Sequence, residues 1–324
     1  MDGENSGDAQ WVAQSFAALR SAIGTVIIGQ DEAVRLSFVT LLCSGHSLYE
    51  GVPGVAKTLL VRTLAAAIGV RFGRIQCTPD LMPSDIIGTP VLHGDGEFRF
   101  RPGPLFTDLL LVDEINRAPA KTQAALLEAM QERAATVDGT RYSLGDWFTV
   151  LATQNPIEQE GTYPLPEAQL DRFMFLVDVG YPTAQEEIEI VKNTTGSRQV
   201  ALKKVLSPEK IMALQDLVRR VPVPDHVVQF AVALVRSTRP KEPNVPEFIQ
   251  KSVAWGAGPR ASQYLVIAAK ARAVLNGRYI ASVEDVRALA RPILCHRVLP
   301  SFHAESEGIT STKLVDQLLA LVKL

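Results

Sequence analysis

The sequence predicts an α/β protein with a mostly parallel, five-stranded sheet, followed by a smaller all-α domain. Five short apolar runs alternate with helical stretches, which is typical of a parallel sheet packed between helices. The runs span residues 46–50, 70–77, 109–113, 148–154 and 173–179. The later pattern is helical only, over 183–195, 207–220, 224–237, 260–276, 283–296 and 310–323. A chain of 324 residues is long enough for both domains.

The elements before the sheet are helical. Residues 1–10 are polar, and we expect no regular structure there, whereas residues 11–23 form an amphipathic pattern. The next helix, 31–44, begins with Asp31 and Glu32, whose charges suit the positive end of a helix dipole. We therefore divide the chain into three parts, namely an N-terminal segment, an α/β domain and a helical domain. Their predicted limits are 1–24, 25–182 and 183–324.

Two insertions interrupt the predicted α/β domain. Residues 78–104 are rich in proline and contain a Gly-Asp-Gly sequence. Residues 134–147 contain Asp138-Gly139 between strand-forming residues, a strong signal for a hairpin turn. We expect both insertions to project from the core of the domain.

The composition excludes several classes of protein. Hydrophobic residues make up 47% of the chain and the formal net charge is −2, so no overall charge favours nucleic acid or an anionic membrane. No apolar run reaches 18 residues, and we expect no membrane insertion. The N-terminus lacks the features of a signal peptide and the three cysteines are scattered, which predicts reduced thiols and a cytoplasmic location.

Residues 51–58 differ by one residue from the phosphate-loop pattern G-x-x-x-x-G-K-[ST]. Such a loop directs backbone N–H groups at phosphates between a strand and a helix. Lys57 would supply a positive charge to the β- and γ-phosphates, and the Thr58 hydroxyl would bind Mg²⁺. Ala56 stands where the last glycine is expected. We expect Ala56 to exclude a large positive φ at low cost, so that the loop still forms.

Two carboxylates follow the apolar run at 109–112. Charged groups are unfavourable inside a sheet, so Asp113 and Glu114 should lie at its carboxyl edge, where the phosphate loop also ends. Asp113 could hold Mg²⁺ through water, and Glu114 could polarise an attacking water. The alternative is a strand end that carries ordinary surface acids.

Three more polar residues fit a phosphate site and also fit simpler roles. Asn155 could contact the γ-phosphate or orient water, although Asn155-Pro156 is also a common turn. Arg172 could reach a neighbouring subunit's γ-phosphate or form a surface ion pair. Arg260 begins a predicted helix and could reach the nucleotide or remain solvated.

In this order, the motifs resemble those of an AAA+ ATPase with a P-loop NTPase core and a helical lid, over residues 25–300. More narrowly, they resemble the MoxR family, in which the alanine before the lysine is itself typical. The motifs that carry this resemblance are residues 51–58, 112–118, 152–156 and 164–173. The lid sequence departs from the family at Gly258, where serine is frequent, and this leaves Arg260 in place.

The resemblance implies a role for each matched residue. Asp113 and Glu114 match the Walker B pair, Asn155 matches sensor 1, Arg172 the arginine finger and Arg260 sensor 2. Catalytic roles are implied for Lys57, Glu114, Asn155, Arg172 and Arg260. Mg²⁺ is implied at Thr58 and, through water, at Asp113. ATP contacts are implied for Ile28, Gly29, Gln30, Gly51, Val52, Pro53, Gly54, Val55, Ala56, Lys57, Thr58, Leu59, Asp113 and Arg260.

MoxR relatives generally remodel other proteins, so the resemblance implies ATP hydrolysis in a homo-oligomeric ring, a hexamer by analogy. It also implies a client protein and a partner in trans with a von Willebrand factor A domain, since no such domain follows the lid here. Arg117 follows the Walker B pair, and the sequence leaves its role open.

Three other functions stay open at this point. A nucleic-acid-directed motor would use the cluster Phe98-Arg99-Phe100-Arg101, although packing of the two phenylalanines is the favoured interpretation and we expect no nucleic acid partner. A magnesium-chelatase-like motor subunit would share the same ATPase apparatus. A scaffold that binds nucleotide without turnover is disfavoured because the catalytic pattern is intact.

Overall fold

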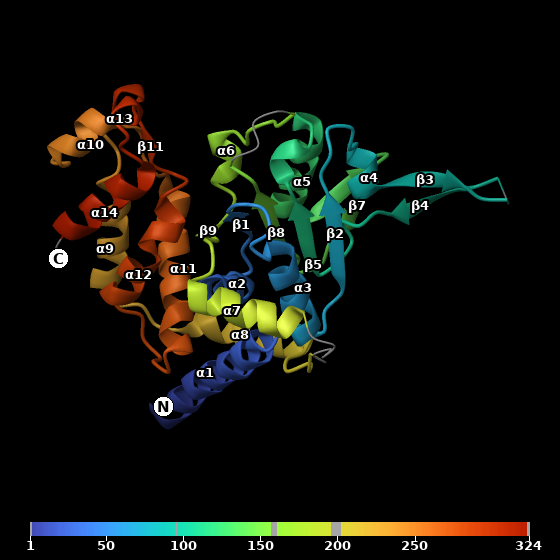
Figure 1. The fold of residues 1–324 in the computed structure, drawn as a ribbon, viewed down its shortest axis with the longest axis horizontal. Helices are drawn as coiled ribbons and strands as arrows, with labels where there is room; N and C mark the ends of the chain where they lie inside the picture. The colour runs from blue at the N-terminus through green and yellow to red at the C-terminus, as the bar shows by residue number, and fades with distance from the viewer. Residues whose placement is uncertain (1, 95, 157–160, 196–201, 323–324) are drawn as a thin grey trace. The chain divides into compact units, whose positions relative to one another are not determined.

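The computed structural model describes residues 2–94, 96–156, 161–195 and 202–322 (Figure 1). The chain divides into two compact units. One contains residues 17–172 and 177–212, and the other contains residues 1–16, 173–176 and 213–324. The domain limits drawn from the sequence stay a prediction, and each unit is described below by itself.

A five-stranded sheet forms the core of the α/β unit, and each strand lies within one of the predicted apolar runs. The order is β2-β5-β8-β1-β9, and β1 with β8, β8 with β5, and β5 with β2 pair in parallel. The strands are β1 (Ser47–Glu50), β2 (Phe72–Gln76), β5 (Leu109–Asp113), β8 (Thr149–Gln154) and β9 (Phe175–Asp178). The central strand β5 is buried along its whole length, as expected for a parallel strand covered on both faces. The predicted fold class is confirmed.

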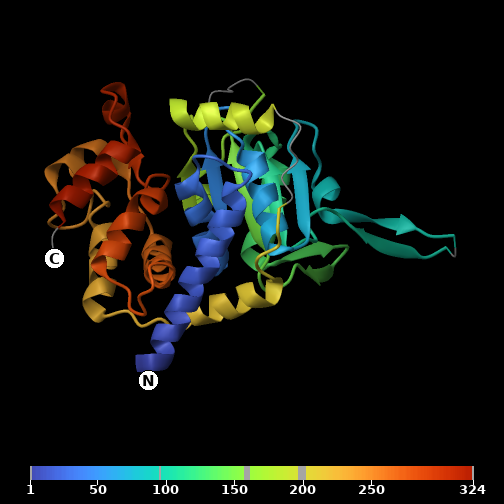
Figure 2. The same ribbon diagram turned by 60° about the horizontal axis from the view of Figure 1, so that its bottom comes forward.

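Helices surround this sheet, and α3 packs against β5 and β8 (Figure 2). The helices up to the lid are α1 (Asp2–Gly24), α2 (Asp31–Leu42), α3 (Lys57–Ile68), α4 (Pro83–Ile87), α5 (Ala120–Glu132), α6 (Glu167–Leu170), α7 (Ala184–Thr194) and α8 (Pro208–Arg220). A short 3-10 helix, η1, spans Ile115–Arg117. The expectation that residues 1–10 lack structure is wrong, because α1 already begins at Asp2. No proline interrupts this segment, and extending an existing helix costs far less than nucleating one.

Both predicted insertions form two-stranded antiparallel ribbons. In the second insertion, β6 (Ala134–Val137) and β7 (Thr140–Ser143) are joined by Asp138 and Gly139, whose φ angles are 48° and 78°. Two positive φ angles are those of the hairpin turn that Asp-Gly predicts, so this prediction is confirmed.

The first insertion forms the ribbon of β3 (Gly88–Leu92) and β4 (Phe98–Pro102), which extends away from the rest of its unit (Figure 1). The base of the ribbon is anchored by Phe100. Its ring centroid lies 5.4 Å from that of Phe106 and 4.3 Å from that of Tyr142. Nearer the tip, Phe98 is exposed. Only the inner of the two phenylalanines therefore packs as predicted.

The second unit is mainly helical, with its core among α9, α11 and α12. Its elements are α9 (Asp225–Arg236), α10 (Glu247–Ser252), β10 (Val253–Trp255), α11 (Pro259–Leu275), α12 (Val283–Leu294), β11 (Leu299–Pro300), α13 (Phe302–Ser306) and α14 (Ser311–Leu321). The predicted helices are present. The structure adds the short helices α10 and α13 and the small ribbon of β10 and β11. Among the described residues, no helix is long and apolar enough to cross a membrane.

Candidate functional site

The phosphate loop connects β1 to α3 and takes its shape from two left-handed residues. Gly54 has a φ of 86° and Ala56 has a φ of 61°. The expectation that Ala56 excludes a large positive φ is therefore wrong. The turn into α3 requires the left-handed conformation there, and an alanine side chain adopts it at a cost of about 1–2 kcal/mol.

Gly51 is needed for a different reason. A Cβ atom on this residue would lie 2.3 Å from the carbonyl oxygen of Val179, so no side chain fits. The same part of the chain is held by a hydrogen bond of 2.8 Å from the Val179 N–H to the Glu50 carbonyl. The start of the loop is thus packed closely against the segment that follows β9.

Lys57 lies across the loop at the carboxyl edge of the sheet. Its Nζ donates to the Gly51 carbonyl and, at 3.3 Å, to the carbonyl of Gln154 at the end of β8. Burial lowers the pKa of Lys57, against the opposing charges of Asp113 and Glu114. The ammonium is held by carbonyl oxygens that phosphate oxygens would replace as stronger, charged acceptors.

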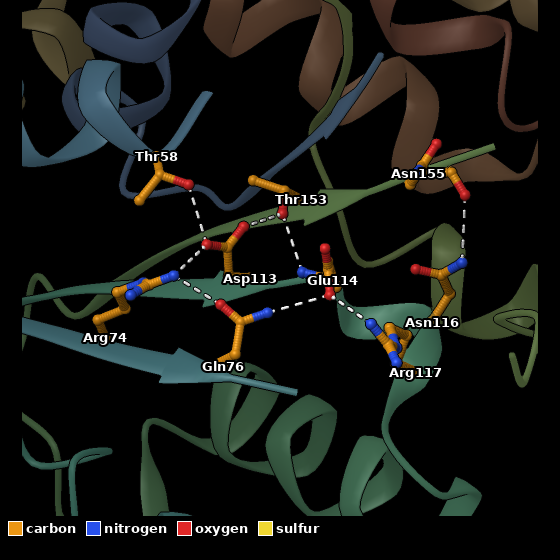
Figure 3. Close-up of polar contacts among 9 residues, drawn as sticks. All are labelled: Thr58, Arg74, Gln76, Asp113, Glu114, Asn116, Arg117, Thr153 and Asn155. Atoms are coloured by element: carbon orange, nitrogen blue, oxygen red, sulfur yellow. Dashed lines mark hydrogen bonds and ion pairs between the residues drawn. The ribbon is translucent and has the colours of Figure 1, made fainter. Parts of the chain in front are cut away.

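The Asp113 carboxylate accepts three side-chain hydrogen bonds (Figure 3). Its Oδ1 accepts from Thr153 Oγ1 at 2.7 Å. Its Oδ2 accepts from Thr58 Oγ1 at 2.9 Å and from Arg74 Nη2 at 2.8 Å. Burial raises the pKa of Asp113, but the hydrogen bonds from Thr153, Arg74 and Thr58 outweigh it and leave the pKa below its ordinary value. The carboxylate is therefore ionised at neutral pH.

A hydroxyl and a carboxylate oxygen side by side suit Mg²⁺, which prefers hard oxygen ligands and keeps several waters. Thr58 Oγ1 and Asp113 Oδ2 supply this pair at the first turn of α3 and the end of β5. The residues present thus fit the metal that the sequence implies.

Glu114 follows directly and holds a left-handed backbone, with φ 57° and ψ 51°. Its backbone N–H donates to Thr153 Oγ1 at 2.9 Å, so Thr153 fixes both acidic residues. The Glu114 carboxylate accepts from Gln76 Nε2 at 3.0 Å and from Arg117 Nη1 at 3.2 Å, both at Oε2 (Figure 3). Arg117, whose role the sequence left open, contacts the catalytic candidate within the same chain.

Asn155 directly follows β8 and is buried, with 5% of its surface exposed. Asn116, in η1, donates from Nδ2 to the Asn155 carbonyl oxygen at 3.4 Å (Figure 3). The two asparagines thus link the ends of β5 and β8 beside the carboxylates. This position is compatible with the sensor role, which stays a prediction.

A cavity of about 220 Å³ lies beside the segment that was expected to contact adenine. Ile28, Gly29 and Gln30 line it. The other lining residues are Arg20, Gly24, Ile27, Asp31, Val34 and Glu189. Gln30 Nε2 donates to the Gly180 carbonyl at 3.4 Å. The apolar side chains and the Gln30 amide suit a base, charged side chains also line the cavity, and the contacts with ATP stay a prediction.

The two predicted arginines lie in different units. Arg172 lies between α6 and β9, and its backbone N–H donates to the Gln169 carbonyl at 3.1 Å. Arg260 is the second residue of α11, which begins at Pro259 after Gly258 at the N-cap, as the sequence predicted. Their roles as arginine finger and sensor 2 stay predictions.

Sequence reasoning missed three residues that contact the carboxylates, namely Arg74, Gln76 and Thr153. Arg74 and Gln76 are exposed and stand two residues apart on β2, so they share one face of that strand. Thr153 is the second-last residue of the predicted strand 148–154. The available signal was polar residues near the carboxyl ends of apolar runs, where strand ends of a parallel sheet meet.

A phosphate loop between a strand and a helix, with Lys57, Thr58 and a carboxylate pair at the same sheet edge, defines a nucleoside triphosphatase of the P-loop class. Comparison with known proteins narrows this class. Residues 46–175 match the ATPase family associated with various cellular activities (AAA), and residues 247–318 match the AAA lid domain.

Individual proteins similar to this chain agree with the family matches. Chaperone MoxR1 of Mycobacterium tuberculosis is 43% identical over 98% of this chain and 85% of the relative. Protein MoxR of Methylorubrum extorquens is 33% identical over 90% of each chain. A crystal structure of a Cytophaga hutchinsonii protein proposed to be an ATPase superimposes with a TM-score of 0.91 at 38% identity and covers 98% of this chain and 97% of that one. The chain belongs to the MoxR family of AAA+ ATPases.

Proposed function

We propose that this protein hydrolyses ATP with Mg²⁺ in an oligomeric ring and uses the energy to remodel partner proteins. The observation that carries the proposal is a hydrogen bond between the residue that ends the phosphate loop and the first of the two carboxylates. The Thr58 hydroxyl, in the first turn of α3, donates to Asp113 at the end of β5, and Glu114 is the next residue. Nucleotide, metal and attacking water would then meet at one edge of the sheet.

Binding of the phosphates would rest on the loop and on Lys57. The loop presents backbone N–H groups at the start of α3, where the helix dipole favours negative charge. Lys57 Nζ already lies within the loop and would add its positive charge to the β- and γ-phosphates. Mg²⁺, held by Thr58 and through water by Asp113, would neutralise charge on the phosphate oxygens.

Glu114 would act as the general base. Its pinned left-handed backbone fixes the direction of the carboxylate, and Thr153 holds the backbone N–H in place. Asn155, at the end of the neighbouring β8, would orient the water or the γ-phosphate.

The ring supplies the remaining groups in this proposal. Arg172 would reach the γ-phosphate bound by the neighbouring subunit, where an arginine stabilises the charge of the transition state. Arg260, at the start of α11, would report the state of the nucleotide to the lid. By analogy with the family the ring would be a hexamer, and a cytoplasmic location stays a prediction.

A protein is the proposed client because of the family and the names of its members. One relative is named a chaperone, and it aligns with nearly the whole of this chain. A von Willebrand factor A domain protein in trans is the proposed partner, from the same resemblance. Capture with the Glu114→Gln protein in ATP would identify both.

The geometry of the ribbon disfavours the nucleic-acid motor. In the register of β3 and β4, Phe98 and Phe100 lie on one face, and Arg99 and Arg101 lie on the other. A platform for single strands needs stacking rings and phosphate-binding cations on the same side. ATPase activity that single-stranded DNA stimulates and salt suppresses would reverse this preference.

Glu114→Gln tests the proposed function. The substitution keeps an acceptor oxygen and similar volume but removes the base, so phosphate release should fall by about 100-fold or more. Binding of Mg²⁺-ATP should stay close to that of the parent, as measured by calorimetry. The matched control is Glu128→Gln, on an exposed position of α5.

Two results would contradict the proposal. Phosphate release at the parental rate would remove Glu114 from its role. A parent protein that releases no phosphate in the assembled state, at saturating Mg²⁺-ATP, would favour the scaffold alternative.

A further inference from the structure

Arg74, on β2, makes a contact that the roles above do not use. Its Nη2 atom donates to two acceptors, Asp113 Oδ2 at 2.8 Å and Gln76 Oε1 at 2.6 Å. The Arg74 side chain is 48% exposed, whereas that of Asp113 is only 11% exposed. A half-exposed cation therefore contacts a carboxylate that is nearly buried and accepts three side-chain hydrogen bonds.

This contact uses the oxygen of Asp113 on which the proposed metal site depends. Thr153 occupies Oδ1, while Thr58 and Arg74 share Oδ2. A carboxylate oxygen offers about two lone-pair positions, so a metal-bound water at Oδ2 must displace one of these two donors. Thr58 must stay, because its hydroxyl is the other metal ligand. Arg74 is the donor that can leave.

The same guanidinium also orients Gln76. An amide side chain has one acceptor end and one donor end. Arg74 bonds to the oxygen, so the NH₂ end of Gln76 is directed to Glu114 Oε2, 3.0 Å away (Figure 3). A continuous row of contacts therefore runs from the metal-binding carboxylate through Arg74 and Gln76 to the proposed base.

We propose that Arg74 competes with Mg²⁺ for Asp113, and that its departure releases Gln76 from Glu114. Arg74 is then a positioning residue that couples arrival of the metal-nucleotide to freedom of the base. The inference rests on the proposed function, which assigns the metal to Asp113 and the base to Glu114. It adds that the Arg74 side chain competes with Mg²⁺ for Asp113, and that binding of the metal frees Glu114 from Gln76.

The first test measures metal dependence of nucleotide affinity, without turnover. Calorimetry gives the Kd of ADP in EDTA and the Kd of Mg²⁺-ADP, and their ratio reports the gain from the metal. Arg74→Ala removes the competitor, so this ratio should rise by about fivefold or more, the usual lower range for coupled sites. Arg74→Lys restores a positive charge near Asp113 and should return the ratio toward that of the parent.

The second test separates the two halves of the row. Gln76→Leu cuts the link to Glu114 but leaves the contact of Arg74 with Asp113, so the metal ratio should stay parental while kcat rises. Gln76 is exposed, so its loss should leave the fold intact. The double variant Arg74→Ala with Gln76→Leu should have the kcat of Gln76→Leu alone, because both changes interrupt one row of contacts.

The matched control is Arg71→Ala. Arg71 pairs with Asp108 at 2.6 Å, so it joins the same two neighbouring strands, but at their starts and away from the site. Its metal ratio and kcat should both stay parental. If Arg74→Ala keeps the parental ratio, or weakens binding equally in EDTA and Mg²⁺, the inference is overturned while the proposed function stands. A parent whose affinity does not respond to Mg²⁺ would overturn both.

Discussion

Two residues of the site, Ala56 and Glu114, hold left-handed backbone conformations that only glycine adopts without strain. Strained backbone of this kind concentrates at functional sites, where surrounding contacts fix it. The loop turns into α3 at Ala56, and the chain turns from β5 into η1 at Glu114. The sequence alone led us to expect the opposite at Ala56. The usual preference of alanine for negative φ was considered without the positive φ that the turn into α3 requires.

Ala56→Gly should therefore stabilise the protein. Glycine removes the strain of the left-handed conformation but adds freedom to the unfolded chain, and the net gain should be about 0.5–1 kcal/mol. Chemical denaturation measures the change in the free energy of unfolding.

The matched control for this prediction is Ala66→Gly, at an exposed position inside α3. There the backbone is helical, so glycine should destabilise the protein by about 1 kcal/mol. Opposite signs at two alanines ten residues apart on the chain would confirm the conformational argument. If Ala56→Gly destabilises the protein as much as the control does, the left-handed angle is not strained.

Elements differ in how well sequence can predict them. The five strands of the sheet were found because buried parallel strands are continuous apolar runs, which need no knowledge of their neighbours. Which strands adjoin is set by the fold, and the order β2-β5-β8 brings Arg74, Gln76 and Thr153 to the carboxylates. The Walker residues were predictable from local motifs, and the side chains that hold them were not.

Short elements escaped prediction for another reason. The helices α10 and α13 have six and five residues, too few to show a helical period. Ser301 at the N-cap of α13, which accepts from the Ala304 N–H, was the one local signal there. The ribbon of β10 and β11 joins residues far apart in the sequence, so no local pattern indicates it.

His46 links three elements of the α/β unit just before β1. Its Nδ1 accepts from the backbone N–H of Val150 in β8 at 2.9 Å, so the proton of the neutral ring lies on Nε2, which faces the Met130 carbonyl of α5 at 3.2 Å. Burial lowers the pKa of His46 to about 4, against the opposing bond to Met130. The protonated ring would lose the Val150 contact, so acid should weaken this junction.

The direction of the pH effect follows from proton binding. The unfolded state takes up a proton near the ordinary histidine pKa, whereas the folded state does so only near 4, so stability from His46 is lost as the pH falls through this window. The loss should approach about 3 kcal/mol by pH 4. His46→Asn keeps an acceptor for Val150 without a titratable ring, so its unfolding free energy should fall less between pH 7 and pH 4.5.

A control separates this effect from other groups that titrate in acid. His226 is exposed on α9, so His226→Asn removes no buried imidazole and should keep the parental pH slope. An equal slope in the parent and the His46→Asn protein, measured by urea denaturation at both pH values, would show that His46 does not carry the effect.

At the scale of the whole molecule, most groups of the proposed site belong to one chain, and a ring would add an arginine from the neighbouring subunit. The contacts among Lys57, Thr58, Asp113 and Glu114 all lie within one unit. Arg172 belongs to the segment just before β9, and its proposed target is the nucleotide of another subunit. If that role is correct, a ring made only of subunits without Arg172, or only of subunits without Lys57, cannot hydrolyse ATP. A ring that contains both kinds of subunit can, because each supplies the group that the other lacks.

Mixing the two variant proteins tests this complementation. Lys57→Ala subunits cannot hold the phosphates but still offer Arg172, whereas Arg172→Ala subunits keep an intact loop. Alone, each should hydrolyse ATP at least about 100-fold more slowly than the parent. In an equal mixture, roughly a quarter of the head-to-tail interfaces would join an intact loop to an intact arginine, so phosphate release should recover in part.

The matched control replaces the Lys57→Ala protein with the double variant Lys57→Ala with Arg172→Ala, which supplies neither group and should restore nothing. Native mass spectrometry of the mixture confirms that mixed oligomers form. If they form and phosphate release does not recover, Arg172 acts within its own chain or not at all, because a ring that shares its catalytic groups between neighbours must show complementation.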